Sequence, residues 1–163
     1  LLNARLTGVA DGIGELLPNG RTIPTHHYDT KGGQFEATLD IMRKHIRRKR
    51  PERALVGAVN DSTALAALHA FREAGLERAC AVAGQDGSLA AREEMRRHSS
   101  RLVCSVAYFP ETYGARIIQL ALDILKHKPV APAVFVQHEV ITPENVNKIY
   151  PNDAWMKRAP DRI

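Results

Sequence analysis

The stretch "VGAVNDSTALAALHAF", Val56 to Phe71, decides the fold of this chain, because an apolar run stops at two polar residues and then restarts as a helix. Its first half belongs to the apolar run Ala54 to Val59, which predicts a strand buried on both faces. Its second half carries a helical stripe formed by Ala64, Leu65, Leu68 and Phe71. Asn60 and Asp61 thus follow a buried strand, at the place where open α/β sheets present polar groups to ligands.

Apolar strands alternate with amphipathic helices along the rest of the chain. The further predicted strands are Cys80 to Gly84, Leu102 to Ala107 and Ala133 to Ile141. The predicted helices are residues 2–16, 35–50, 61–74, 88–97 and 112–126, followed by a helical turn capped by Thr142, and residues 22–29 are expected to be extended. This alternation predicts a parallel α/β sheet with helices on both faces. The polar, proline-marked segment from Tyr150 onward is expected to be a tail or surface arm.

Size and composition are those of one ordinary globular domain. The chain has 163 residues, of which 44% are apolar and 25% charged. Its two cysteines, Cys80 and Cys104, fit no metal spacing and no disulfide framework. Both lie in apolar runs, so we expect them to act as small buried hydrophobes, and they do not decide the redox compartment.

The beginning of the chain carries no secretory leader pattern, and no stretch approaches the roughly 20 apolar residues that cross a bilayer. Membrane insertion is therefore not expected. The first residue is Leu1, and an amphipathic pattern is already under way there. We interpret the sequence as a fragment or a processed chain, in which a missing leader says nothing about the compartment.

The net charge of +5 is concentrated in "RKHIRRKRPER", Arg43 to Arg53. Such a run can bind phosphate groups. It is more often the solvated face and C-terminal end of a helix, where cations complement the dipole, and Pro51 would stop that helix. Aromatic residues for base stacking do not interleave the basic ones, so the second reading is favoured.

Polar residues follow three successive predicted strands. Asn60 follows the first, Asp86 follows the second and Tyr108 follows the third. Because the carboxyl ends of parallel strands meet at one edge, an amide, a carboxylate and a phenol should converge there. This set suits a polyhydroxyl ligand, whose hydroxyl pairs bind carboxylates and amides while an aromatic face covers the sugar ring.

Each candidate also has a purely structural interpretation. Asp61 precedes the helix and is expected to be its N-cap, which leaves Asn60 free either to contact a ligand or to shape the loop. Asp86 is followed by Gly87 and has the alternative role of a turn carboxylate. Tyr108 has the alternative role of a core residue.

Signatures of catalysis, of metal binding and of cofactor binding are missing. The sequence has no nucleophile elbow, no P-loop and no dinucleotide-binding glycine pattern. His26 and His27 are adjacent, so on an extended segment they point to opposite faces and cannot jointly hold one metal ion. The other histidines are scattered without ligand spacing. We therefore expect no enzyme, no cofactor and no metal.

Five motifs occur in the order found in a known family. They are "RLTGVADGIGE" (Arg5 to Glu15), "VGAVNDSTALAALHAFREAG" (Val56 to Gly75), "VAGQDG" (Val82 to Gly87), "LVCSVAYFPETYGARIIQLALDIL" (Leu102 to Leu125) and "ITPENV" (Ile141 to Val146). Together they resemble the carboxy-terminal half of type I periplasmic sugar-binding proteins and of the ligand-binding cores of lactose-repressor-family regulators. The resemblance covers nearly all of the chain up to about Asp153.

The resemblance implies two α/β lobes with a sugar clamped between them. Residues 1–108 would form the second, carboxy-terminal lobe without its first strand. Residues 109–134 would cross to the first lobe, residues 135–150 would be the return strand and hinge, and residues 151–163 a tail. The family's ligand residues map onto Asn60 and Asp86. Tyr108 departs from the Gln often found at its position in sugar binders.

Two functions follow from the resemblance. In the first, the chain is part of a solute-binding protein that delivers a small sugar to the permease of an ABC transporter, in the periplasm or at the cell exterior. In the second, it is the effector-sensing core of a cytoplasmic transcription regulator, which would bind DNA only through an upstream domain. A homodimer remains open. We favour the transport function, because the chain shows no basic surface of a DNA-contacting type.

Overall fold

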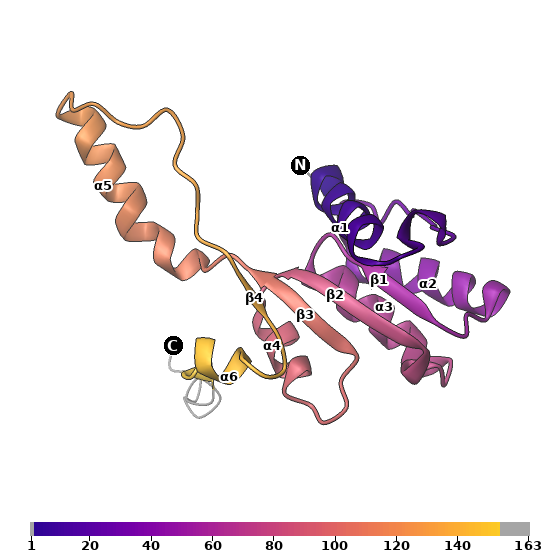
Figure 1. Ribbon diagram of the computed structural model, residues 1–163. Coiled ribbons are helices and arrows are strands. Elements are labelled where there is room, and N and C mark those ends of the chain that lie inside the picture. The colour runs from indigo at the N-terminus through magenta and orange to yellow at the C-terminus, as the bar shows by residue number, and fades with distance from the viewer. Residues whose placement is uncertain (1, 154–163) are drawn as a thin grey trace.

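The computed structural model describes residues 2–153, and its elements alternate as the sequence predicts (Figure 1). The α-helices are α1 (Leu2–Leu16), α2 (Phe35–Lys49), α3 (Asp61–Glu73), α4 (Leu89–Met95), α5 (Tyr113–Leu125) and α6 (Val146–Ile149). The strands are β1 (Ala54–Gly57), β2 (Cys80–Asp86), β3 (Leu102–Ala107) and β4 (Glu139–Ile141). Three short 3-10 turns are η1 (Gly20–Thr22), η2 (Glu77–Ala79) and η3 (Pro110–Thr112).

The four strands form one mostly parallel sheet in the order β1-β2-β3-β4. The pairs β1–β2 and β2–β3 are parallel, whereas β4 runs antiparallel to β3. The prediction of a wholly parallel sheet is therefore wrong for the last strand. The predicted strand Ala133 to Ile141 is also too long, because only Glu139 to Ile141 lie opposite β3, and residues 133–138 have no strand beside them.

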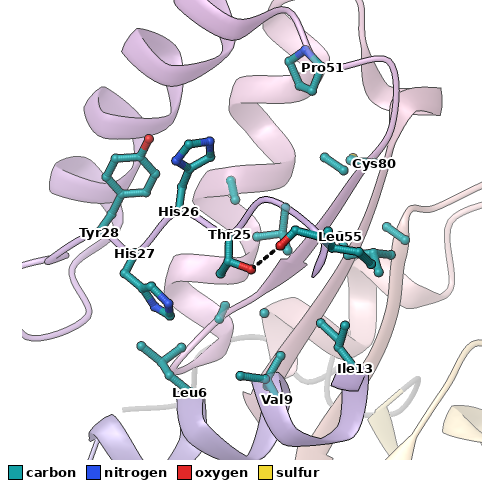
Figure 2. Close-up of a pocket in the computed structure, with 18 of the residues that line it drawn as sticks. Leu6, Val9, Ile13, Thr25, His26, His27, Tyr28, Pro51, Leu55 and Cys80 are labelled. Atoms are coloured by element: carbon teal, nitrogen blue, oxygen red, sulfur yellow. Dashed lines mark hydrogen bonds between the residues drawn. The ribbon is translucent and has the colours of Figure 1, made fainter. Parts of the chain in front are cut away.

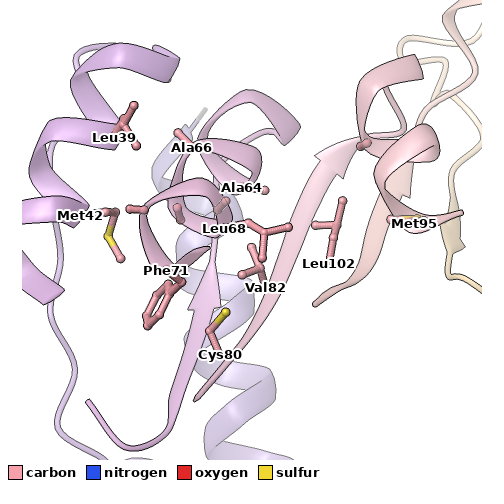
Figure 3. Packing of buried hydrophobic residues seen from close by; sticks show 14 of the residues in the cluster. Leu39, Met42, Ala64, Ala66, Leu68, Phe71, Cys80, Val82, Met95 and Leu102 are labelled. Atoms are coloured by element: carbon pink, nitrogen blue, oxygen red, sulfur yellow. The ribbon is translucent and has the colours of Figure 1, made fainter. Parts of the chain in front are cut away.

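Helix α3 lies at the centre of the hydrophobic core (Figure 3). Its buried alanines allow α2 to pack closely against it, and Leu68 and Phe71 are completely buried. They pack in one cluster with Val82 of β2 and Leu102 of β3. Helix α1 reaches the sheet at β1, where a Cβ added to Gly57 would meet the side chain of Val9. These contacts hold the strand ends in a fixed arrangement.

The ends of two helices follow the local signals. Gly75 closes α3 with a φ of +68°, a left-handed conformation that glycine adopts without a Cβ penalty, as the sequence predicts. Helix α2 ends at Lys49, one residue before the predicted end and two before Pro51, with Arg50 in the left-handed region. The predicted cap at Thr142 is wrong, since α6 begins only at Val146 and Asn145 occupies the cap position.

The basic run is the exposed end of α2. Its last turn carries Arg47, Arg48 and Lys49, all exposed. Arg43 forms a two-pronged ion pair with Glu73 of α3, with nitrogen–oxygen distances of 2.7 Å for both. This arrangement agrees with the interpretation of the run as a solvated helix face.

The segment from α5 to residue 138 extends away from the sheet as an arm (Figure 1). No residue of α5 is buried, although Ile117 and Ile118 are apolar and 60% and 62% exposed. Phe135 on the returning segment of the arm is 85% exposed. The arm therefore has an apolar surface that nothing within the described residues covers.

The end of the described chain is packed rather than free. Asp153 is 5% exposed and accepts hydrogen bonds from Arg92, while Arg96 lies 2.8 Å from the same carboxylate. Tyr150 stacks on Phe109 with ring centroids 5.8 Å apart. The expectation of a tail or arm is thus wrong for residues 150–153, and residues 154–163 lie outside the described residues.

Candidate functional site

The carboxyl ends of the three parallel strands meet at one edge of the sheet, where the side chain of Arg5 connects them. Arg5 Nη1 donates to the carbonyl oxygen of Val59 after β1, at 2.5 Å. The same nitrogen lies 3.2 Å from the carboxylate of Asp86 at the end of β2. The Arg5 guanidinium also lies 5.2 Å from the centroid of the Tyr108 ring after β3. Asp86 pairs with Ala107 in the sheet, and this register brings Asp86 and Tyr108 to the same place at the edge.

Asp86 ends β2 in an unusual backbone conformation. Its φ is +120°, in a region that few residues other than glycine adopt, and Gly87 follows at +68°. A Cβ at Gly87 would meet the backbone and side chain of Ala107, so only glycine fits there. The turn leaves the Asp86 side chain 44% exposed beside Arg5. A carboxylate is thereby presented to solvent at the sheet edge.

Tyr108 is not a core residue, but a half-buried side chain at the same edge. Its hydroxyl donates to Gln85 Oε1 at 2.8 Å, and Gln85 itself is buried. This hydrogen bond fixes the ring next to Arg5, with which it forms a cation–π contact. The phenol ring and the Asp86 carboxylate therefore both lie beside the Arg5 guanidinium.

The roles predicted for Asn60 and Asp61 are reversed in one respect. Asn60, not Asp61, is the N-cap of α3: its Oδ1 accepts from the backbone N–H of Thr63 at 2.9 Å, in a capping box. Its Nδ2 donates to the carbonyl oxygen of Gly33 at 3.1 Å. Sequence reasoning failed because both residues are good caps, and only the backbone angles decide which one stands outside the helix. Asn60 is therefore not free, although each polar atom of its amide retains one further hydrogen-bonding position.

Asp61 is not the predicted cap of α3 but a buried residue in its first turn. It is the first residue of α3 and is only 1% exposed. Its carboxylate accepts from Ser105 Oγ and from the backbone N–H of Ser88, both at 2.6 Å. Burial is the main cause that raises the pKa of Asp61, and the hydrogen bonds from Ser105 and Ser88 counteract it only in part.

Arg5 is the residue that the analysis of strand ends missed. It lies on α1, so inspecting only the residues after each strand passes over it. The signal was its place near the start of α1, because a helix that begins at the carboxyl edge of a sheet brings its first turns to the same edge as the strand ends. Its presence adds a cation to a set that was predicted to hold an amide, an acid and a phenol.

This cluster has the chemistry for a ligand rich in hydroxyl groups. A carboxylate accepts hydrogen bonds and a guanidinium donates them, so the pair can bind two neighbouring hydroxyls at once. The Tyr108 ring offers an apolar face, and its hydroxyl retains the capacity to accept a hydrogen bond. The cluster lies at the carboxyl edge of the sheet, where the Asp86 side chain is 44% exposed.

A hollow of the molecule lies away from this cluster, beside the free edge of β1 (Figure 2). This groove has a volume of about 1300 Å³ and is lined mainly by α1, residues 23–28 and β1. Leu55 of β1 is 60% exposed, which corrects the prediction that this strand is buried on both faces. None of Asn60, Asp86 and Tyr108 lines the groove. An apolar groove next to an unpaired strand edge suits a further strand better than a sugar.

The histidines of residues 22–29 lie on one wall of this groove. Figure 2 shows His26 and His27 on opposite sides of the extended segment, as predicted. Tyr28 Oη lies 2.6 Å from His45 Nδ1 of α2, and the His26 ring lies 5.2 Å from the His45 ring. Burial and the neighbouring His26 lower the pKa of His45. These contacts attach the segment to α2.

Within residues 2–153, no three histidine, cysteine, aspartate or glutamate side chains are grouped so that they could hold a metal ion. In the same part of the chain, no helix combines the length and the apolar character needed to cross a membrane.

Comparison with known proteins gives one family match. Residues 3–143 match the family described as periplasmic binding protein-like domain. No curated protein sequence matches the chain significantly.

Three solved structures illustrate the similarity of fold. A solute-binding protein of an ABC transporter from Bacillus halodurans, with bound myo-inositol, is 27% identical over 72% of this chain and 40% of its own, with a TM-score of 0.63. The myo-inositol binding protein of Caulobacter is 22% identical over 88% and 47%, with a TM-score of 0.68. A periplasmic solute-binding protein of an ABC transporter from Actinobacillus succinogenes, with bound D-allose, is 22% identical over 71% and 40%, with a TM-score of 0.64. This chain thus spans less than half the length of each.

Proposed function

Since this chain belongs to the periplasmic binding protein-like domain family, whose members are binding proteins rather than enzymes, we propose that it is the carboxy-terminal lobe of a sugar-binding protein. The observation that carries this proposal is the cluster at the carboxyl edge, where Arg5 joins Asp86 and Tyr108. These groups bind the hydroxyls and the ring of a small sugar or sugar-like polyol, and Asn60 contributes through the unused half of its amide.

The ligands bound in the similar structures support a polyol as the substrate class. They are myo-inositol and D-allose, both bound by solute-binding proteins. By analogy, the chain belongs to a transport system, in the periplasm or at the cell exterior, and passes its ligand to the permease of an ABC transporter. Ligand binding selects the closed arrangement of two lobes.

The arm and the groove support the division into lobes that the sequence predicted. Residues 109–134 cross to the first lobe, whose sheet covers the apolar face of α5, and residues 135–150 return to the second. The groove beside β1 accommodates the first strand of the second lobe, which pairs with the free edge of β1. In this arrangement the exposed apolar surfaces of Leu55, Ile118 and Phe135 become internal.

Calorimetry on the full-length protein tests the proposal, with myo-inositol, D-allose, D-galactose and D-fructose as probes. We expect at least one of them to bind, and Asp86→Ala and Arg5→Ala to weaken that binding by about 1–3 kcal/mol each through the loss of charged hydrogen bonds. Glu52→Ala and Arg53→Ala are matched controls, because they remove the same charges at the opposite edge of the sheet, next to the start of β1. Unchanged affinity in both site variants would show that the ligand binds elsewhere.

A further inference from the structure

The loop Asp86–Ser88 is held by a buried carboxylate from another strand end. The backbone N–H of Ser88 donates directly to Asp61 Oδ2 at 2.6 Å. The backbone N–H of Gly87 donates to Ser105 Oγ at 3.1 Å, and that hydroxyl donates in turn to Asp61 Oδ1 at 2.6 Å. Both amides that follow Asp86 are therefore fixed, directly or through one hydroxyl, by the two oxygens of Asp61.

The sheet leaves no room for this carboxylate to move. Asp61 is 1% exposed and Ser105 is fully buried. A Cβ added to Gly84 of β2 would clash with Asp61 Oδ1, so the strand approaches the carboxylate as closely as its backbone allows. An immobile acceptor pair of this kind defines where the two amides must lie.

The loop needs such an anchor because of its backbone. Asp86 has a φ of +120° and Gly87 a φ of +68°, and this region is strained for an aspartate. Such a conformation persists only when surrounding contacts determine it. On the carbonyl side, Arg92 Nη1 donates to the Gly87 oxygen at 2.5 Å, which adds a third contact.

We propose that Asp61 is a positioning residue, which holds the strained Asp86–Ser88 loop so that the Asp86 carboxylate faces the ligand beside Arg5. This inference rests on the proposed function for its consequence, the affinity for a sugar, but its structural part can be tested without any ligand. It assigns a binding role to a buried residue that touches no ligand itself.

The anchor responds to pH. Titratable and charged groups that face it are Asp86 in the loop, Cys104 of β3, and Arg92 and Arg5 on the outer side of the loop. Burial raises the pKa of Asp61, so its protonation begins above the usual aspartate range of about 3.9. A protonated carboxyl keeps one good acceptor oxygen and donates through the other, so Asp61 no longer accepts from both the Ser88 N–H and Ser105 Oγ. One of these two anchoring hydrogen bonds is therefore lost or reversed as the pH falls.

The contribution of Asp61 to the free energy of unfolding increases as the pH falls, whereas its hold on the loop decreases. A group whose pKa is raised by folding contributes stability that is fully present below its unfolded pKa and is lost as the pH rises through its folded pKa. Acid therefore favours the fold through this residue while it weakens the loop.

The decisive experiment follows the amide resonances of Gly87 and Ser88 by NMR in the full-length protein, from about pH 8 to about pH 4. We expect the Ser88 amide to titrate in the wild type and in Asp86→Asn, because Asp61 takes up a proton as the pH falls, and not to titrate in Asp61→Asn. Titration that persists in Asp61→Asn, or disappears in Asp86→Asn, would overturn the proposal.

Affinity is the second readout, measured by calorimetry at neutral pH with the best-bound of the four sugar probes. We expect Asp61→Asn to weaken binding about tenfold and Ser105→Ala about fivefold, because each frees one anchor of the loop. Ser105→Ala also decides the question if Asp61→Asn does not fold. Glu94→Gln is the matched control: it alters another carboxylate that is 6% exposed, and it contacts Arg72 rather than the loop.

Two failures remain distinguishable. If no sugar binds the wild type, the proposed function fails, and the Ser88 amide still decides whether Asp61 anchors the loop. If sugars bind but both anchor variants retain wild-type affinity while their melting temperatures fall, Asp61 is only a structural residue and the inference is wrong.

Discussion

Helices α3 and α5 have the same length and opposite surroundings. Each comprises 13 residues, yet eight residues of α3 are buried and none of α5. The apolar stripe of α5, with Ile117, Ile118 and Leu125, is at least as strong as that of α3. The difference shows that an apolar stripe predicts a helix with a face that must be covered by another element. Whether that face is buried depends on whether the covering element lies within the described residues.

Polar contacts repeat this contrast. Helix α3 begins with the capping box of Asn60 and Thr63, and near its end Arg72 forms a forked ion pair with the buried Glu94 of α4. Helix α5 begins after Thr112, whose side chain makes no capping hydrogen bond. Its hydrogen bond between Gln119 and Asp123 is exposed. Local and tertiary contacts thus reinforce each other in α3 only.

Removing the largest buried side chain of α3 should have the greatest effect. Phe71 is 0% exposed, and Phe71→Ala should lower the free energy of unfolding by about 3–5 kcal/mol through lost burial and a cavity. Urea denaturation followed by circular dichroism measures this loss. A loss below about 1 kcal/mol would mean that α3 is not the centre of the core.

Breaking the ion pair between α3 and α4 should have the next largest effect. We expect Glu94→Gln to cost about 2–3 kcal/mol at neutral pH, since it removes the buried one of the two carboxylates, Glu94 and Glu77, that pair with Arg72. Burial alone would raise the pKa of Glu94, but hydrogen bonds from Arg72 and Ser100 hold it below its usual range.

The same pair gives a pH dependence with a definite sign. A carboxylate whose pKa is lowered by folding adds stability that is present above its unfolded pKa, about 4.3 for glutamate, and is lost as the pH falls through its folded pKa. The difference in unfolding free energy between the wild type and Glu94→Gln should therefore be constant near neutrality and shrink below about pH 4. A difference that grows in acid would contradict the assignment.

The two helix starts allow a matched comparison of caps. Asn60→Ala should cost about 1 kcal/mol, because it removes the acceptor for the Thr63 amide, whereas Thr112→Ala should cost almost nothing. Thermal unfolding of both variants measures the two effects. Equal losses of stability in the two variants would show that the capping hydrogen bond of Asn60 does not stabilise α3.

The smallest effect is expected on the exposed face of α5. In the 163-residue chain, Ile118→Ser should change the unfolding free energy by no more than about 0.5 kcal/mol. The backbone amides of α5 should also exchange with solvent faster than those of α3. In a two-lobe protein, the same substitution should become as costly as a core substitution, at about 2 kcal/mol or more. An equal, small effect in both settings would rule out a first lobe that covers this face.

Sequence patterns predicted most of the elements but misjudged several surroundings. Strand β3 was predicted with its exact residues, and α1, α2 and α5 within about one residue at each end. The exposure of Leu55, the shortness of β4 and the buried Asp153 were not predicted, because each depends on whether a neighbour from a distant part of the chain is present.

The candidate site divides in the same way. The parallel order of the strands predicted that Asn60, Asp86 and Tyr108 lie at one edge, and in the structure Asp86 and Tyr108 each contact Arg5 there. Arg5 itself lies on a helix, which the pattern of strand ends does not include. Asn60, and not Asp61, is the cap of α3, so residue type alone does not predict which of two adjacent polar residues caps a helix. Their backbone angles, which the packing of α3 on the sheet sets, make one the cap and bury the other.

By itself the sequence determined the alternation of strands and helices, because the spacing of apolar residues is a local property that each segment carries with it. Only the tertiary structure decided that a buried carboxylate fixes the loop beside Arg5 and that α5 lies uncovered. Both depend on which surfaces meet across the fold, and no local spacing records that.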